Sequence, residues 1–222
     1  MKTALAEGAN FWNGGEFYGP PDRNSLQLLN AYFTKYPEDA DKVVLSVKGG
    51  ADLKRLWPDG SEEGIKMSVE NCLSLLGGKK KLDIFECARV DPATPIEETM
   101  KYLNKYVEEG KIGAISLSEV GAESIRRAAK VAKICAVELE LSLSNPDVLT
   151  NGIAAACAEN NIPIVAYSPL GRGLLVSSAM TRWKLVAWLT DNSLVITLRS
   201  IRFPRLTHIY LKSETLRTLR TI

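Results

Sequence analysis

The chain has 222 residues, of which 45% are apolar and 24% are charged, and its net charge is +2. This composition is close to that of soluble globular proteins, and the length suits one large domain or two small ones. Because no apolar run approaches the roughly 20 residues that cross a bilayer, we exclude a membrane-spanning chain and expect no membrane partner.

Short apolar segments rich in Val, Ile and Phe alternate with amphipathic helical patterns. In chain order we expect a strand at 9–12, a helix at 25–33, strands at 43–47 and 82–87, a helix at 97–107, a strand at 114–117, a helix at 123–132, a strand at 137–141, a helix at 151–160 and a strand at 162–167. Gly77, Gly78 and Gly110 stand where helix C-caps belong. This alternation predicts stacked βα units and a parallel sheet.

Two all-parallel architectures fit this alternation: an open doubly wound sheet and a closed (β/α)₈ barrel. The glycines at positions 14, 15 and 19 do not match the G-x-G-x-x-G spacing of the doubly wound fold. Polar residues instead follow many different strands, as in a barrel active site: Asn13, Lys48, Arg89 with Asp91, Ser118 with Glu119, Ser142 and Ser168. We therefore favour an α/β fold of the (β/α)₈ TIM-barrel type, incomplete because about six of the eight strands are recognisable.

The cysteines give no sign of a metal site or of disulfides. They are scattered, and each lies inside an apolar run: Cys72, Cys87, Cys135 and Cys157. Since they lack the paired spacing of a zinc site and the N-terminus lacks a signal-peptide core, we expect reduced thiols, no metal and a cytoplasmic protein.

A tyrosine and a lysine stand near two neighbouring strand ends. Tyr18 follows two glycines in NFWNGGEFYG, and Lys48 ends VVLSVKGG. Each has an ordinary explanation, as a packed loop tyrosine and a solvated turn lysine. A nearby ammonium, however, lowers the pKa of a phenol from about 10, so that the phenol can donate a proton to a carbonyl oxygen as hydride reaches the carbon. Tyr18 and Lys48 would then be a general acid and its electrostatic partner.

From about residue 4 to Leu175 the chain resembles the aldo-keto reductase family. The resemblance rests on GANFWNGGEFYG, VVLSVKGG, LDIFECARVDP followed by PIEET, EEGKIGAISLSEV and AYSPLGRGLL. FECARVDP, SLSEV and VELELSL are similar to the fungal pyridoxal reductase branch. The resemblance implies NADPH-dependent reduction of a small aldehyde, pyridoxal to pyridoxine, with hydride from the cofactor and a proton from Tyr18.

The resemblance assigns the family's catalytic tyrosine to Tyr18 and its lysine to Lys48. The family's Asp falls on Asn13, which can hydrogen-bond the lysine but carries no charge. The family's histidine falls on Ala88, so no imidazole polarises the substrate there. We interpret these departures as divergence, which a substrate with its own ring nitrogen and phenolic hydroxyl would compensate.

The resemblance also assigns contacts to the nicotinamide carboxamide. These fall on Ser118 and on Glu138, where the family usually has Gln, while Glu119 replaces the usual Asn. Glu138 accepts hydrogen bonds but does not donate, so it would hold only the carboxamide nitrogen. An alternative that we favour equally is that Glu138 pairs with a lysine or lies at a solvent-exposed strand end.

The remaining cofactor contacts come from AYSPLGRG. The resemblance implies that Tyr167 stacks under the nicotinamide ring with Ser168 beside it. The following segment, with Leu170, Arg172 and its backbone amides, would reach the pyrophosphate.

The C-terminal segment differs in kind from the body. Residues 176–222 carry eight Lys/Arg and two Asp/Glu, a net of +6, so residues 1–175 carry a net of −4. We divide the chain into a partial barrel, 1–175, and a basic tail, 176–222, in which 183–189 and 193–198 are candidate short strands. An alternative exon or shifted reading frame would explain the tail. Its basic and aromatic residues lie on no readable face, so we expect no nucleic-acid partner.

A barrel without its first and last strands has two open edges. We expect a monomeric reductase, and keep as the alternative a catalytically inactive truncated fragment or a partner-binding remnant. The segment that would grip the 2′-phosphate is not recognisable, which leaves NADPH against NADH open.

Overall fold

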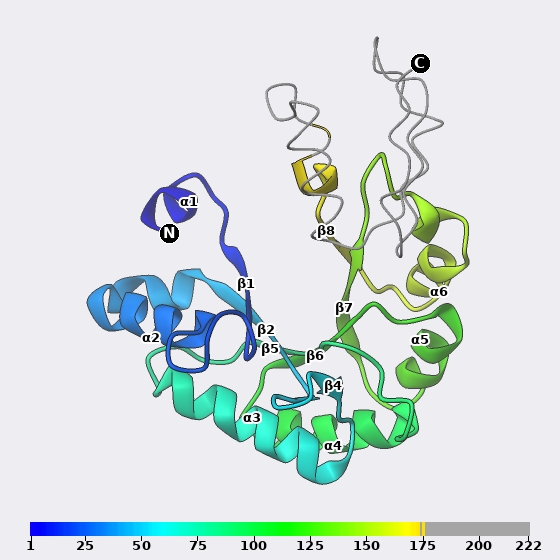
Figure 1. The fold of residues 1–222 in the computed structure, drawn as a ribbon, viewed down its shortest axis with the longest axis horizontal. Coiled ribbons are helices and arrows are strands. Elements are labelled where there is room, and N and C mark those ends of the chain that lie inside the picture. The colour runs from blue at the N-terminus through cyan, green and yellow to red at the C-terminus, as the bar shows by residue number, and fades with distance from the viewer. Residues whose placement is uncertain (174, 176–222) are drawn as a thin grey trace, which may run out of the picture. The chain divides into compact units, whose positions relative to one another are not determined.

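The computed structural model describes residues 1–173 and 175, and the chain divides into two compact units, Met1–Pro169 and Leu170–Ile222. The first unit holds the α/β architecture (Figure 1). Of the second unit, the described residues include one 3₁₀ turn, η3 (Gly171–Gly173). The predictions for 176–222 lie outside the described residues.

Six parallel strands form the main sheet, in the order β1-β2-β5-β6-β7-β8. They are β1 (Phe11–Gly15), β2 (Val44–Gly49), β5 (Ile84–Cys87), β6 (Ala114–Ser118), β7 (Ile134–Glu140) and β8 (Ile164–Tyr167). The sheet curls, with helices on its outer side, so the predicted barrel-type architecture is confirmed (Figure 1). All six predicted strands are present, but several ends are shifted, and Asn13 and Lys48 lie within strands rather than after them.

Five longer helices accompany the strands. They are α2 (Ser25–Lys35), α3 (Glu62–Leu76), α4 (Ile96–Glu108), α5 (Ala122–Ala129) and α6 (Ile153–Glu159). We did not predict α3 from the sequence, because Gly64 and the two serines Ser68 and Ser74 dilute its apolar pattern. Its expected C-cap was nonetheless found, because Gly77 has φ +57° and its N–H bonds the carbonyls of Leu73 and Ser74.

Shorter elements complete the described chain. They are α1 (Lys2–Ala6), the antiparallel pair β3 (Ala51–Asp52) and β4 (Trp57–Pro58), and two 3₁₀ turns, η1 (Pro37–Lys42) and η2 (Asp147–Leu149). These elements were not predicted, because runs this short carry little periodicity. No helix in the described part of the chain has the length and apolar character that crossing a membrane requires.

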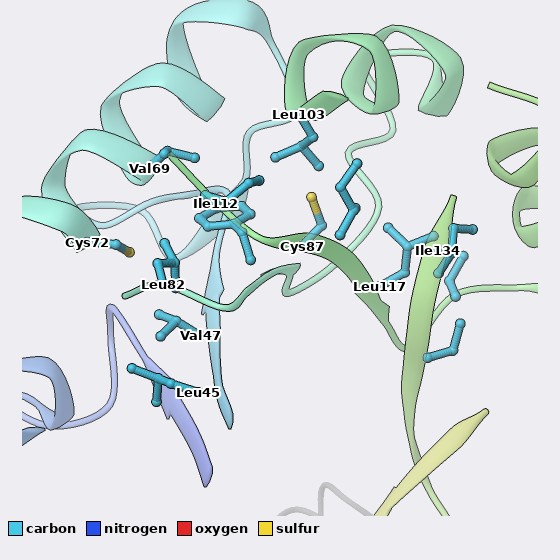
Figure 2. Close-up of a cluster of buried hydrophobic side chains, with 14 of the residues drawn as sticks. Leu45, Val47, Val69, Cys72, Leu82, Cys87, Leu103, Ile112, Leu117 and Ile134 are labelled. Carbon is cyan, nitrogen blue, oxygen red and sulfur yellow. The ribbon is translucent and has the colours of Figure 1, made fainter. Parts of the chain in front are cut away.

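The core lies between the outer face of the sheet and the helices (Figure 2). Side chains such as Leu45, Val47 and Phe85 are fully buried on this face. The alternate residues of the same strands point to the opposite, inner face. Strands rich in Val, Ile and Phe are typical of sheets that are buried and apolar on both faces, and here only the outer face is apolar. The inner face is buried but largely polar, and carries Ser46, Lys48, Glu86, Ser116, Ser118 and Glu138.

Candidate active site

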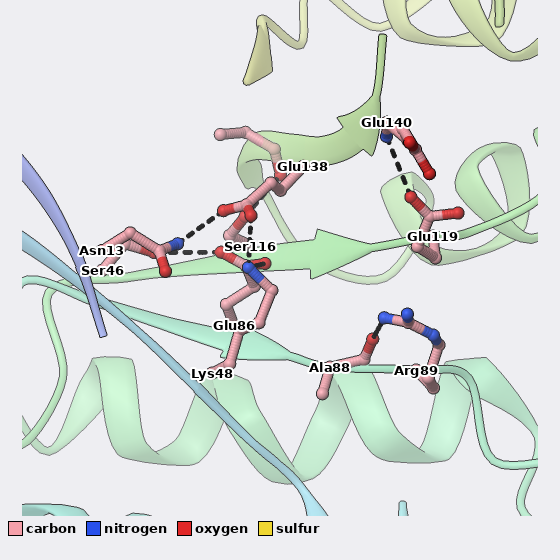
Figure 3. A network of polar contacts seen from close by, with 11 residues as sticks. Asn13, Ser46, Lys48, Glu86, Ala88, Arg89, Ser116, Glu119, Glu138 and Glu140 are labelled. Atoms are coloured by element: carbon pink, nitrogen blue, oxygen red, sulfur yellow. Dashed lines mark hydrogen bonds and ion pairs between the residues drawn. The ribbon is translucent and has the colours of Figure 1, made fainter. Parts of the chain in front are cut away.

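Lys48 lies among two buried carboxylates on the inner face (Figure 3). Its Nζ donates a hydrogen bond to Oε1 of Glu138 and lies 2.9 Å from Oε1 of Glu86. Asn13 Nδ2 donates to the other oxygen of Glu138 at 2.5 Å, and Ser46 Oγ donates to Oε2 of Glu86 at 3.1 Å. We call these five residues the lysine cluster. It joins β1, β2, β5 and β7.

The pKa values of the charged residues in the cluster depend on one another because these residues are buried away from water. Burial lowers the pKa of Lys48, but the carboxylates of Glu86 and Glu138 outweigh this effect and raise the pKa above its ordinary value. Burial raises the pKa of Glu86, and the charge of Glu138 adds to the rise while the Lys48 ammonium opposes it. Lys48 is therefore a protonated cation at neutral pH.

Tyr18 lies beside this cation. The Nζ of Lys48 is 6.0 Å from the centroid of the Tyr18 ring, and Tyr18 is 40% exposed. The ring packs against Gly15, where a Cβ would lie 2.8 Å from Cγ of Tyr18, so this position leaves no room for a side chain. The structure thus brings together the two residues that the sequence singled out. Their catalytic roles stay predictions.

The loop that carries Tyr18 is fastened at both ends. The side chain of Glu16 is buried, and its carboxylate accepts hydrogen bonds from Ser68 Oγ and, at 2.7 Å, from Asn71 Nδ2, both on α3. Asn24 donates to the backbone carbonyl of Glu16 at 3.1 Å and also caps α2. Neither anchor was predicted as a site residue.

Glu16→Ala is expected to destabilise the fold and to loosen the Tyr18 loop. The substitution leaves Ser68 and Asn71 without their acceptor, at a cost of about 1–3 kcal/mol. Burial raises the pKa of Glu16 above its ordinary value of 4.5, so the group stabilises the fold less as the pH rises through that raised pKa. Urea unfolding should therefore show a larger difference between wild type and Glu16→Ala at acidic than at neutral pH. The control is Glu70→Ala, because Glu70 is exposed on α3, the helix that carries Ser68 and Asn71. If both substitutions destabilised the fold equally, the role of Glu16 in anchoring the Tyr18 loop would be contradicted.

A second group of predicted residues lies where β6, β7 and β8 end. Ser118 Oγ is buried and has no hydrogen-bond partner among the described residues. Glu119, with φ +50°, accepts a hydrogen bond from the N–H of Glu140 at 2.9 Å. Burial, together with the Glu119 carboxylate, raises the pKa of Tyr167. Ser168 follows Tyr167, also with φ +50°.

This end of the sheet suits a nicotinamide carboxamide. Ser118 is paired in register with Glu138, and its buried hydroxyl, which has no partner in the described part of the chain, can both donate and accept. The Glu138 carboxylate has about four acceptor positions, of which two are used by Lys48 and Asn13. Of the two open alternatives for Glu138, the structure shows the pairing with a lysine, and the contact with a carboxamide stays a prediction.

The other predicted positions are described individually. Leu170, 56% exposed, and Arg172, with φ +54°, belong to the second unit, so their contribution to the site stays a prediction. Ala88 is buried, and its carbonyl accepts a hydrogen bond from Arg89 Nη1 at 2.5 Å (Figure 3). The only histidine of the sequence, His208, lies outside the described residues. Within those residues no three His, Cys, Asp or Glu side chains form a metal-binding group.

Comparison with known proteins shows which family has this architecture. The sequence model of the aldo/keto reductase family matches residues 1–186. The chain belongs to the aldo/keto reductase family. The match extends past the boundary predicted at residue 175, and the division of this family member into barrel and tail stays a prediction.

The match to each curated relative covers only part of that relative's length. A probable pyridoxal reductase 2 from Schizosaccharomyces pombe is 53% identical over 183 residues, which are 82% of this chain and 55% of the relative. A putative pyridoxal reductase from Saccharomyces cerevisiae is 42% identical over 209 residues, 87% of this chain and 60% of the relative. This aldo/keto reductase chain thus spans little more than half the length of these relatives.

Solved structures agree on the fold. The glycerol dehydrogenase of Gluconobacter oxydans superposes with a TM-score of 0.71 at 25% identity, over 82% of this chain and 55% of the other. A thermostable aldo-keto reductase superposes with a TM-score of 0.67 at 22% identity, over 86% of this chain and 66% of the other. Both support the barrel-type fold of this family member.

Two members of the lysine cluster, Ser46 and Glu86, were not predicted from the sequence. Ser46 alternates with apolar residues and with Lys48 in VLSVKG, and Glu86 is the one charged residue of IFEC. That period-two signal was available, since an isolated polar residue on a buried face must find a partner there.

Proposed function

We propose that this chain carries the catalytic centre of an NADPH-dependent reductase that converts pyridoxal to pyridoxine. The observation that carries the proposal is the buried Lys48 cation 6.0 Å from the centre of the Tyr18 ring. Family membership and the names of the fungal relatives support oxidoreduction of an aldehyde. Because the chain spans part of these relatives, the activity itself belongs to the proposal.

Tyr18 is the proton donor in this proposal. When bound, NADPH would supply the hydride that the carbonyl carbon accepts. The Tyr18 hydroxyl gives its proton to the carbonyl oxygen, which becomes the product hydroxyl, and the Lys48 ammonium stabilises the phenolate that remains. Asn13 holds the cluster from β1 through its hydrogen bond to Glu138.

The cofactor is held, in the same proposal, by residues at the ends of β6 to β8 and in the segment that follows. Ser118, Glu119 and Glu138 bind the carboxamide, and Glu119 also accepts a hydrogen bond from the Glu140 N–H. The other contacts are Tyr167 and Ser168 at the nicotinamide ring and Leu170 and Arg172 at the pyrophosphate.

We place the protein in the cytoplasm as a monomer acting on a small-molecule aldehyde, without nucleic acid or membrane. The placement is supported by the four cysteines, which are all free thiols, three of them buried. A reducing compartment keeps such thiols unmodified.

The purified full chain is the test. Titration with NADPH is expected to change cofactor fluorescence, and addition of pyridoxal is expected to consume NADPH and yield pyridoxine. Benzaldehyde, which lacks the ring nitrogen and the phenolic hydroxyl, is the comparison substrate and should be reduced more slowly. Absence of both NADPH binding and turnover would overturn the proposal in favour of an inactive fragment or partner-binding remnant, and preference for NADH or benzaldehyde would overturn its specific form.

A further inference from the structure

We propose that Glu138 is a positioning residue that aims the Lys48 ammonium, and that Asn13 holds Glu138 in this orientation. Where it concerns turnover, this inference rests on the proposed function. The pairing itself can be tested without turnover.

The two carboxylates act differently on Lys48. Glu86 lies on β5, the strand next to β2, directly beside Lys48 in register. Its Oε1 forms an ion pair with Nζ at 2.9 Å. Glu138 lies 90 residues away in sequence, accepts a hydrogen bond from Nζ and reaches it from β7 (Figure 3). Strand pairing therefore holds Glu86 beside Lys48, whereas Glu138 draws the ammonium toward β7.

Asn13 is suited to Glu138 because it is an amide. Its Nδ2 donates to Oε2 of Glu138 at 2.5 Å, across 125 residues of sequence. A carboxylate at residue 13 would face the Glu138 carboxylate at this contact and repel it. The amide of Asn13 and the carboxylate of Glu138 thus form one complementary contact, and Glu138 brings its negative charge to Lys48 from β7.

A double-mutant cycle tests this contact by swapping its amide and carboxylate, using Asn13→Asp, Glu138→Gln and the double substitution in the full chain. Urea unfolding needs no turnover. We expect Asn13→Asp to destabilise the fold, and the added Glu138→Gln to recover it with a coupling of roughly fivefold or more in the unfolding equilibrium constant. If Asn13→Asp does not fold, recovery of folding in the double variant supports the pairing. A double variant that is no more stable than Asn13→Asp, or coupling under about twofold, would overturn it.

Turnover and its pH profile separate positioning from a merely structural role. Within residues 1–173 and 175, the charged or titratable groups that contact Lys48 are Tyr18, Glu86 and Glu138. Glu138→Gln should lower kcat about tenfold or more and move the basic limb of the profile to lower pH, since loss of a negative charge lowers the pKa of the Lys48 ammonium. The double variant should return both toward wild type. Wild-type kcat and profile in Glu138→Gln would overturn the positioning role.

Glu97→Gln is the matched control. Glu97 on α4 pairs through both carboxylate oxygens with Arg127 on α5, outside the lysine cluster. This variant loses a carboxylate from an ion pair and should leave kcat and the pH profile unchanged. If wild type itself gives no turnover, the proposed function fails, while the unfolding cycle still decides whether Asn13 and Glu138 are coupled.

Discussion

Lys48→Met is expected to remove turnover and to destabilise the fold by about 3–5 kcal/mol, because it leaves Glu86 and Glu138 buried without their cation. Methionine fills a similar volume, so the loss reports charge rather than packing. The turnover should fall at least about a hundredfold, since the phenolate of Tyr18 loses its stabilising charge. Urea unfolding and the NADPH-consumption assay measure the two effects.

Lys80→Met separates the two effects. Lys80 is also buried, only 6% exposed, and its ammonium pairs with Asp83 at 2.5 Å, outside the lysine cluster. We expect this control to lose stability and to retain kcat. Wild-type turnover in Lys48→Met, or an equal loss of turnover in Lys80→Met, would contradict the role assigned to Lys48.

Tyr18→Phe is expected to lower kcat by about 10²–10⁴ while the fold and NADPH binding stay as in wild type. The substitution removes only the hydroxyl of a ring that is 40% exposed and keeps the packing of that ring on Gly15. Unfolding free energy should therefore change by less than about 0.5 kcal/mol. Single-turnover kinetics and a fluorescence titration with NADPH measure chemistry and binding separately.

Tyr102→Phe, on α4, is the matched control, because it removes a tyrosine hydroxyl from a partly buried ring outside the site. It should leave kcat unchanged. If Tyr18→Phe retained more than about a tenth of wild-type kcat, another group would have to be the proton donor.

Polar side chains from several strands gather on the inner face of the sheet, and this is how a few residues form a site. Alternation places Leu45 and Val47 in the core and Ser46 and Lys48 on the opposite face of the same strand. A buried cation on that face needs carboxylates close by, and Glu86 and Glu138 provide them. Burial of the Lys48 cation thus requires the polar residues that alternate with apolar ones along these strands, and the same polar residues form the candidate active site.

The sequence by itself predicted the six strands of the main sheet, their parallel direction and the proximity of Tyr18 to Lys48. Strand and helix periods are local properties, and strands that are successive along the chain become neighbours in a βα sheet, so residues near the ends of β1 and β2 come together whatever the details. The family motifs identified the same two residues.

Only the tertiary structure decided what surrounds Lys48. Glu138 is 90 residues from Lys48 and 125 from Asn13, and it reaches both because the sheet curls and brings β7 across the inner face toward β1 and β2. Curvature of a sheet is the sum of many small twists and packing contacts, which no single segment encodes. The same reason explains the Glu16 anchor, since its partners Ser68 and Asn71 lie on α3 and are brought to the Tyr18 loop by packing alone.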